Sequence, residues 1–178
     1  MNTGGRGRSL RLARRQTVVS VFSAAGVLGL LVFLSQSAGS TSALRRMYAV
    51  VTGLVVNAFG ANAVVRGTDI VSAQFSISVV TACTGLFVTG LFLVAVAAFP
   101  TSWRSRLVGA ALGIAGLFFV NVVRLASLFY VGIHWPGILD VVHQLVWQSL
   151  VIVIAVSLWL LWAGRSASAK AVAGRARS

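Results

Sequence analysis

The segment Thr81-Ala82-Cys83-Thr84-Gly85-Leu86 holds the only cysteine of the chain and leads directly into the apolar run Leu86–Phe99. The residues before it are polar and rich in serine, so the chain changes character at this point. This change predicts that Cys83 lies at the first turn of a membrane helix. At such a position, the unpaired backbone amides and the positive end of the helix dipole favour the thiolate over the thiol.

The composition is that of an integral membrane protein. Of the 178 residues, 58% are hydrophobic and only 10% are charged, and the mean hydropathy is +0.93, far from the balance of a soluble domain. The apolar residues concentrate in four runs, namely Val18–Leu34, Leu86–Phe99, Leu107–Val123 and Leu145–Ala163. Each run is long enough to enter a bilayer as a helix. We therefore expect a single all-α membrane domain with about four transmembrane helices.

The distribution of basic residues orients these helices. With the N-terminus in the cytoplasm, eleven of the fifteen Lys and Arg residues lie on the cytoplasmic side, and the reverse orientation would invert this bias. The eleven are Arg6, Arg8, Arg11, Arg14, Arg15, Arg104, Arg106, Arg165, Lys170, Arg175 and Arg177. We expect a basic cytoplasmic arm over residues 1–16, a membrane-embedded domain over residues 17–164 and a basic cytoplasmic tail over residues 165–178. The protein is then a multi-pass plasma-membrane protein with both termini in the cytoplasm.

The formal net charge of +13 indicates anionic lipid headgroups rather than nucleic acid as the partner of the basic segments. No aromatic residues are interleaved with the arginines of the N-terminal arm, so we expect no nucleic acid binding. The chain has only two acidic residues, Asp69 and Asp140, and no cluster with metal-ligand spacing. We therefore expect neither a metal nor a cofactor.

The region between the first two apolar runs is expected on the outer face. Ala43–Phe59 has the spacing of an amphipathic helix lying along the outer leaflet. The apolar face of this helix comprises Leu44, Met47, Val51, Leu54, Val55 and Ala58. The turn-like Arg66-Gly67-Thr68-Asp69 follows, and then Phe75, Ile77 and Val79 alternate with serines. These patterns indicate a short extracytoplasmic β-hairpin or extended lid that leads into Cys83.

The third apolar run belongs to a helix longer than the bilayer is thick. Ser102 is expected to cap its N-terminus, and the helix is expected to run to about Val131, before a turn at Gly132–Gly137 and a new helix near Ile138. Its small residues lie on one stripe and indicate close packing against other helices. They are Gly109, Gly113 and Gly116.

Three polar residues fall at one depth in this topology. Cys83 begins a helix that enters the membrane from outside, Arg124 ends a helix that emerges there, and His143 begins the last helix from the same face. Each alone has a simple explanation as a packing cysteine, an arginine that snorkels to headgroups and an interfacial histidine. His134 is a second candidate histidine, in a less constrained position. Together the three residue types suit acyl transfer, since a thiolate attacks a carbonyl, an imidazole protonates the leaving amine and a guanidinium stabilises negative charge.

The same residues resemble the exosortase/archaeosortase family. Thr81–Leu86 is similar to the A-C-x-G-[LI]-type cysteine motif of that family, with Thr84 and Gly85 in its variable and glycine positions. Asn121-Val122-Val123-Arg124 is similar to its N-x-x-R motif, and His143 opens the final helix as the later histidine does. The resemblance covers roughly residues 63–150. It implies Cys83 as nucleophile, His143 as general acid and base, and Arg124 as electrostatic stabiliser, with Asn121 one turn below Arg124 in a position to orient it.

This resemblance implies a membrane cysteine protease or transpeptidase. Its partners would be exported proteins that end in a sorting signal, which comprises a short motif, a membrane helix and a basic tail. Cleavage would occur at the outer membrane interface through an acyl-enzyme on Cys83. Two alternatives remain open from the residues alone: a non-enzymatic membrane subunit of a transport or assembly complex, and a family member that binds sorting signals without cleaving them. The recognition motif, the acceptor and the oligomeric state are not encoded in these patterns.

Overall fold

The computed structural model describes residues 18–29, 32 and 38–175, with side chains up to residue 168. An apolar helix, Val18–Gly29, comes first. The remaining elements are α2 (Ala38–Ala58), β1 (Val64–Arg66), β2 (Asp69–Val71), β3 (Ser76–Ser78), a 3₁₀ turn (Thr81–Thr84), α3 (Leu86–Ala98), α4 (Trp103–His134), a 3₁₀ turn (Pro136–Ile138), α5 (Leu139–Val141), a π-helical segment (Val142–Trp147) and α6 (Gln148–Arg175).

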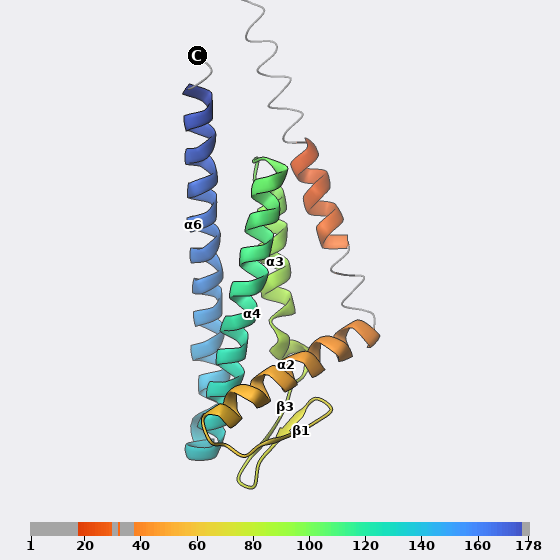
Figure 1. Cartoon of the computed structure of the whole chain (residues 1–178), viewed down its shortest axis with the longest axis vertical. Helices are drawn as coiled ribbons and strands as arrows, with labels where there is room; N and C mark the ends of the chain where they lie inside the picture. Colours follow the sequence, from red (N-terminus) through yellow and green to blue (C-terminus); the bar gives the residue numbers. More distant parts are fainter. Residues whose placement is uncertain (1–17, 30–31, 33–37, 176–178) are drawn as a thin grey trace, which may run out of the picture.

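Long helices dominate the fold. Helices α3, α4 and α6 pack against one another as a bundle (Figure 1). Among the described residues, two apolar helices are long enough to cross a bilayer, Trp103–His134 and Pro136–Ser168. The expected mostly helical architecture is therefore confirmed, with two helices that are long and apolar enough to cross a membrane. Helix α3 has 13 residues, about 20 Å, and is shorter than the hydrocarbon core. Part of the run Val18–Leu34 lies outside the described residues, so the expected total of four membrane spans stays a prediction.

The third helix begins and packs as its sequence indicated. The Ser102 side chain accepts a hydrogen bond from the Ser105 amide, which is the expected N-cap. A Cβ atom at Gly109 would overlap Trp162 of α6, and one at Gly113 would overlap Phe92 of α3. These glycines let the three helices approach closely, as the small-residue stripe predicted.

The connection between α4 and α6 begins later than the sequence suggested. Helix α4 continues through His134, and the chain then passes through the 3₁₀ turn at Pro136. The expected turn at Gly132 is absent because Gly132 is buried against Phe75, so this part of α4 is held by packing. Pro136 lacks a backbone N–H and disfavours a helical conformation at Trp135, so α4 ends at His134.

Helix α2 crosses the bundle obliquely near the end where the strands lie (Figure 1). It covers residues 38–58, a little more than the predicted amphipathic helix. The side that packs on the protein contains Tyr48, Ala49, Thr52 and Val56, all buried. Met47 and Leu54 of the predicted apolar face are exposed instead. Helix α2 therefore has a second apolar face. The spacing of its apolar residues alone did not show which of the two faces packs on the protein.

The strands form a small antiparallel sheet in the order β1-β2-β3. Arg66 pairs with Asp69 across the first turn, and Ile70 pairs with Ile77 in the second ladder. The alternation predicted from the sequence appears in the exposure of β3, where Ile77 is half-buried between two exposed serines. The sheet has one strand more than a hairpin, and its last strand leads to Cys83.

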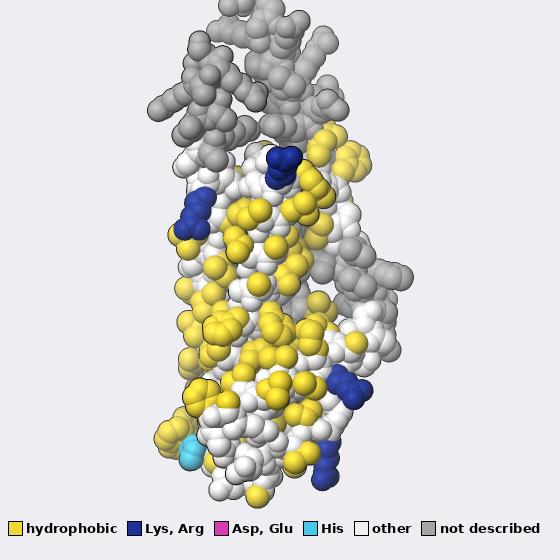
Figure 2. Space-filling model, in the orientation of Figure 1, with side chains coloured by type: hydrophobic (Ala, Val, Ile, Leu, Met, Phe, Trp, Pro, Cys, Tyr) yellow, Lys and Arg dark blue, Asp and Glu magenta, His cyan; other side chains and the backbone are white. Residues whose placement is uncertain are grey.

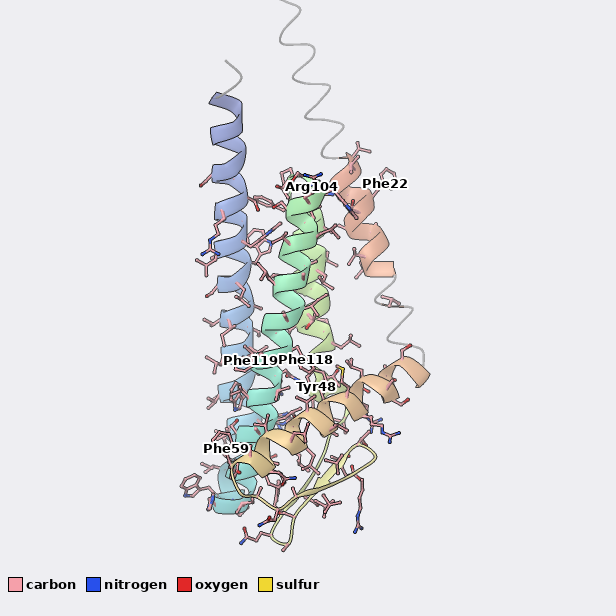
Figure 3. All side chains as sticks on the ribbon, in the orientation of Figure 1. Phe22, Tyr48, Phe59, Arg104, Phe118 and Phe119 are labelled. Carbon is pink, nitrogen blue, oxygen red and sulfur yellow. The ribbon has the colours of Figure 1, made fainter. Side chains whose placement is uncertain are left out.

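Two groups of buried apolar side chains hold the fold. One lies between α3, α4 and α6 and includes Phe92, Leu117 and Trp162. The other lies between α2, the sheet and α4, and it includes Ile70, Phe129 and Cys83 itself. In the same group the ring of Tyr48 contacts that of Phe118 in a tilted arrangement, with centroids 4.8 Å apart (Figure 3). Cys83 is thus part of the packed interior rather than of a mobile loop.

The surface is divided along the long axis. Hydrophobic side chains cover the middle of the face shown in Figure 2, and basic side chains lie toward its two ends. The exposed large apolar residues of the bundle include Phe87, Leu112 and Leu160. A contiguous apolar surface of this kind is stable in lipid rather than in water.

Candidate active site

Cys83 lies in a short 3₁₀ turn of its own, Thr81–Thr84. Its amide donates to the Val80 carbonyl at 2.9 Å, and the Thr84 hydroxyl donates to the Thr81 carbonyl at 2.7 Å. Gly85 follows with φ of 65°, a left-handed conformation that separates this turn from α3. The prediction that Cys83 belongs to the first turn of the membrane helix is therefore wrong. Cys83 lies in a separate turn that comes before α3. The polar Thr84 and the left-handed Gly85 are the physical reason, since they close the turn before α3 begins.

Asn121 of α4 holds this turn from the side. Its Nδ2 donates a hydrogen bond of 2.6 Å to the carbonyl oxygen of Cys83. The residue is only 1% exposed, and its Oδ1 has no hydrogen-bond partner among the described residues. The sequence indicated that Asn121 orients Arg124, whereas the bond that the structure shows goes to Cys83.

His143 is the imidazole closest to the thiol. Its Nε2 lies 3.9 Å from the Cys83 Sγ, across 60 residues of sequence. The distance is at the long end for a hydrogen bond to sulfur, as is common in sites without substrate. His143 is half-buried within the π-helical segment. His134, the rival candidate, is exposed at the end of α4, with its ring 5.7 Å from that of Trp135.

Arg124 is buried and incompletely paired. It is 5% exposed, and its Nε has no hydrogen-bond partner among the described residues. It lines the same cavity as Thr81 and Ala82, the two residues that precede Cys83. A side chain this deeply buried does not fit an arginine that snorkels to headgroups, and arginines at membrane depth are rare and usually functional.

A cavity of about 550 Å³ borders the turn that carries Cys83. Its walls come mainly from α3 and are apolar, for example Phe87, Leu91 and Val94. Three lining residues have polar side chains, Thr81, Arg124 and Gln148. The cavity has the size and character of a ligand pocket, with an apolar wall and a few polar groups.

Two residues near the site were not singled out from the sequence. Tyr48 of α2 is buried beside Asn121; burial raises the pKa of Tyr48 to about 12, and the neighbouring Asn121 acts in the opposite direction. Arg45 donates from Nε to the Val79 carbonyl at 2.7 Å and from Nη2 to the Thr68 hydroxyl at 3.2 Å. No local pattern identifies these residues, because each acquires its partner through the packing of α2.

The described residues include no group of three or more His, Cys, Asp or Glu side chains that could hold a metal ion. What the site contains is a thiol, an imidazole and a buried guanidinium beside an apolar cavity. Such a set suits acyl transfer without a metal ligand set. Together with the long apolar helices, it defines a membrane-embedded protein with a thiol site.

Residues 7–160 match the family described as transmembrane exosortase (Exosortase_EpsH). Because the match covers most of the chain, the protein belongs to this family, as its cysteine and arginine motifs predicted. Membership suggests a cysteine transpeptidase located in the membrane. Comparisons with curated proteins and with solved structures find no match.

Proposed function

We propose that the protein cleaves C-terminal sorting signals of exported proteins through an acyl-enzyme on Cys83. The observation that carries this proposal is the 3.9 Å approach of the Cys83 Sγ to the His143 Nε2. The family membership supports it, because it suggests a membrane transpeptidase. The buried Arg124, whose Nε has no hydrogen-bond partner among the described residues, supports it as a source of positive charge.

The chemistry follows the roles of the three side chains. His143 accepts the thiol proton, and the Cys83 sulfur attacks the scissile carbonyl carbon to form a tetrahedral adduct whose oxyanion Arg124 stabilises. The carbon–nitrogen bond then breaks, and the His143 imidazolium gives its proton to the leaving amine. This leaves a thioester on Cys83. An acceptor amine or water attacks the thioester, gives an amide or a carboxylic acid, and regenerates the thiol.

The site is proposed to face the outer side of the membrane, with both termini in the cytoplasm. The positive-inside bias supports this orientation. The membrane-embedded domain is proposed to comprise residues 17–164, between the basic arm and the basic tail. Helix α6 continues to Arg175, so part of the tail extends this helix.

The test is conversion of precursor to product in cells that express an exported protein with a C-terminal anchor. Cys83→Ala should leave the anchor uncut, and Cys83→Ser should be nearly as inactive, because a hydroxyl is far less ionised than a thiol near neutral pH. His143→Ala should lose most activity, and Cys83→Ala combined with His143→Ala should be hardly worse than either alone, since residues that act as a unit are non-additive.

His134→Ala is the matched control and should process like the wild type. Product at wild-type level from Cys83→Ala would end the enzymatic proposal. Reaction of the thiol with a small electrophile then separates the remaining options. An inert thiol indicates a packing cysteine in a non-enzymatic subunit, whereas a reactive thiol without processing indicates a protein that binds signals without cleaving them.

A further inference from the structure

The polar lining of the cavity includes a carboxamide to which the mechanism gives no role. Gln148, the first residue of α6, lines the cavity together with Arg124. Its carboxamide forms no hydrogen bond with any residue that the structure describes. Gln148 is exposed, so its donor and acceptor groups are open to a ligand beside apolar walls such as Leu91 and Val94. A ligand that enters the cavity can supply the missing partners.

The π-helical segment explains how Gln148 reaches this cavity. In an α-helix, consecutive residues are 100° apart around the axis, so Gln148 would lie about 140° away from His143. The π-helical turn at Val142–Trp147 takes up one extra residue and reduces this offset to about 40°, which is the offset of residues i and i+4. His143 and Gln148 thereby come to one side of the helix. Gln144 and Gln148 are both exposed, but only Gln148 lines the cavity.

We propose that Gln148 contacts the substrate by pairing with a backbone peptide group close to the scissile bond. Its Nε2 donates to a peptide carbonyl, and its Oε1 accepts from a peptide N–H. This inference rests on the proposed function, because it takes the molecule bound in the cavity to be a peptide substrate.

The physical reason is the unpaired backbone of the substrate. A peptide that presents a scissile bond to Cys83 is extended there, so its N–H and C=O groups have no helical partners. Each such group is expensive in apolar surroundings. Arg124 has only donors and can pair with carbonyls alone. Gln148 has a donor and an acceptor, and it can therefore satisfy both halves of a peptide unit.

Because the chain has one cysteine, a pair of alkylating probes tests this contact directly. The probes are ethyl vinyl sulfone and an acetylated Leu-Leu-Ala peptide that ends in the same vinyl sulfone. In both, the Cys83 thiolate adds to the terminal vinyl carbon, the neighbouring carbon takes up a proton, and a thioether results. Intact mass of the purified full-length protein in lipid nanodiscs gives both rates. The ratio of the peptide rate to the ethyl rate measures recognition of the peptide part.

We expect a ratio well above one for the wild type. Gln148→Leu, which keeps the size but removes both hydrogen-bonding groups, should lower the ratio about tenfold, as expected for the loss of two hydrogen bonds. It should leave the ethyl vinyl sulfone rate unchanged. Gln144→Leu should leave both rates unchanged, and Cys83→Ala should not react.

Three results would overturn the inference. They are a wild-type ratio near one, an unchanged ratio in Gln148→Leu, and an equal fall of both rates in Gln148→Leu, which would make Gln148 a support for the thiol. The proposed function has a separate readout in precursor processing. If processing fails but the ratio of the peptide rate to the ethyl rate still depends on Gln148, the site binds peptides without carrying out the proposed reaction.

Discussion

The Nδ2 of Asn121, inside α4, donates a hydrogen bond of 2.6 Å to the backbone carbonyl oxygen of Cys83. The bond connects the helix that carries Arg124 to the turn that carries the thiol. Its donor and its acceptor lie in the packed interior, where no solvent replaces a lost partner. We infer that Asn121 sets the position of the Cys83 backbone relative to α4.

Asn121→Ala should therefore destabilise the protein and disturb the thiol. The Cys83 carbonyl would lose its donor, at a cost of about 1–3 kcal/mol. We expect a lower melting temperature in detergent and a changed rate of Cys83 alkylation by ethyl vinyl sulfone. Val123→Ala, at an exposed position of the same helix, should change neither. Wild-type values of both quantities in Asn121→Ala would contradict this role.

Gly85→Ala should be harmful for two reasons. The left-handed conformation costs a residue with a side chain about 1–2 kcal/mol, and the new Cβ would lie 3.3 Å from the Asn121 Oδ1. Gly137→Ala is the control, because a Cβ at Gly137 meets no atom within 4 Å and its φ is not positive. Thermal unfolding should show a loss for Gly85→Ala and little change for Gly137→Ala. Equal stability of the two variants would mean that the turn tolerates a side chain.

Arg124→Lys should lose most processing activity while the protein still accumulates in the membrane. A lysine carries the charge but not the planar fork that binds a carbonyl oxygen at two points. The measurement is product formation together with membrane abundance on an immunoblot. Arg104→Lys should remain active, since Arg104 is exposed at the opposite end of α4 from the site (Figure 3). Full activity in Arg124→Lys would leave Arg124 with a role that any cation can fill.

Arg45 should position Cys83 from a distance. Its hydrogen bonds to the Val79 carbonyl and the Thr68 hydroxyl hold the end of the sheet just before the cysteine turn. Arg45→Gln should slow alkylation of Cys83 several-fold, as expected for the loss of about 1 kcal/mol of ordering. The control is Arg46→Gln, which removes the same positive charge at a neighbouring exposed position without affecting the sheet. Its Cys83 should react at the wild-type rate. The same rate in both variants would exclude a positioning role for Arg45.

The membrane orientation makes a separate prediction. Single cysteines introduced in the Cys83→Ala protein should be labelled by an impermeant maleimide in intact cells at Ser72 and Gly137, but not at Ser9 or Ser168. The reason is that the positive-inside bias keeps both basic ends in the cytoplasm. Labelling at Ser168 without labelling at Gly137 would reverse the orientation, and the proposed site would then face the cytoplasm.

Much of the architecture was predictable because it depends on local sequence. Hydropathy identified the apolar helices, and the small residues of α4 predicted close packing, which the structure shows against Phe92 and Trp162. The Ser102 cap was recognisable because a cap acts over three residues. The exact start of α3 was not predicted, since it depends on the left-handed Gly85 rather than on hydropathy.

The sequence by itself determined the membrane-embedded helices and the residue types available for chemistry, because hydrophobic run length, charge bias and short motifs are written along the chain. Tertiary structure alone decided how they meet. Packing of α4 against the cysteine turn paired Asn121 with Cys83, and the π-helical turn brought His143 to the thiol and Gln148 to the cavity. Partners that are 38 or 60 residues apart share no local pattern. Their contacts follow from which helix faces are buried together, and that is a property of the folded chain.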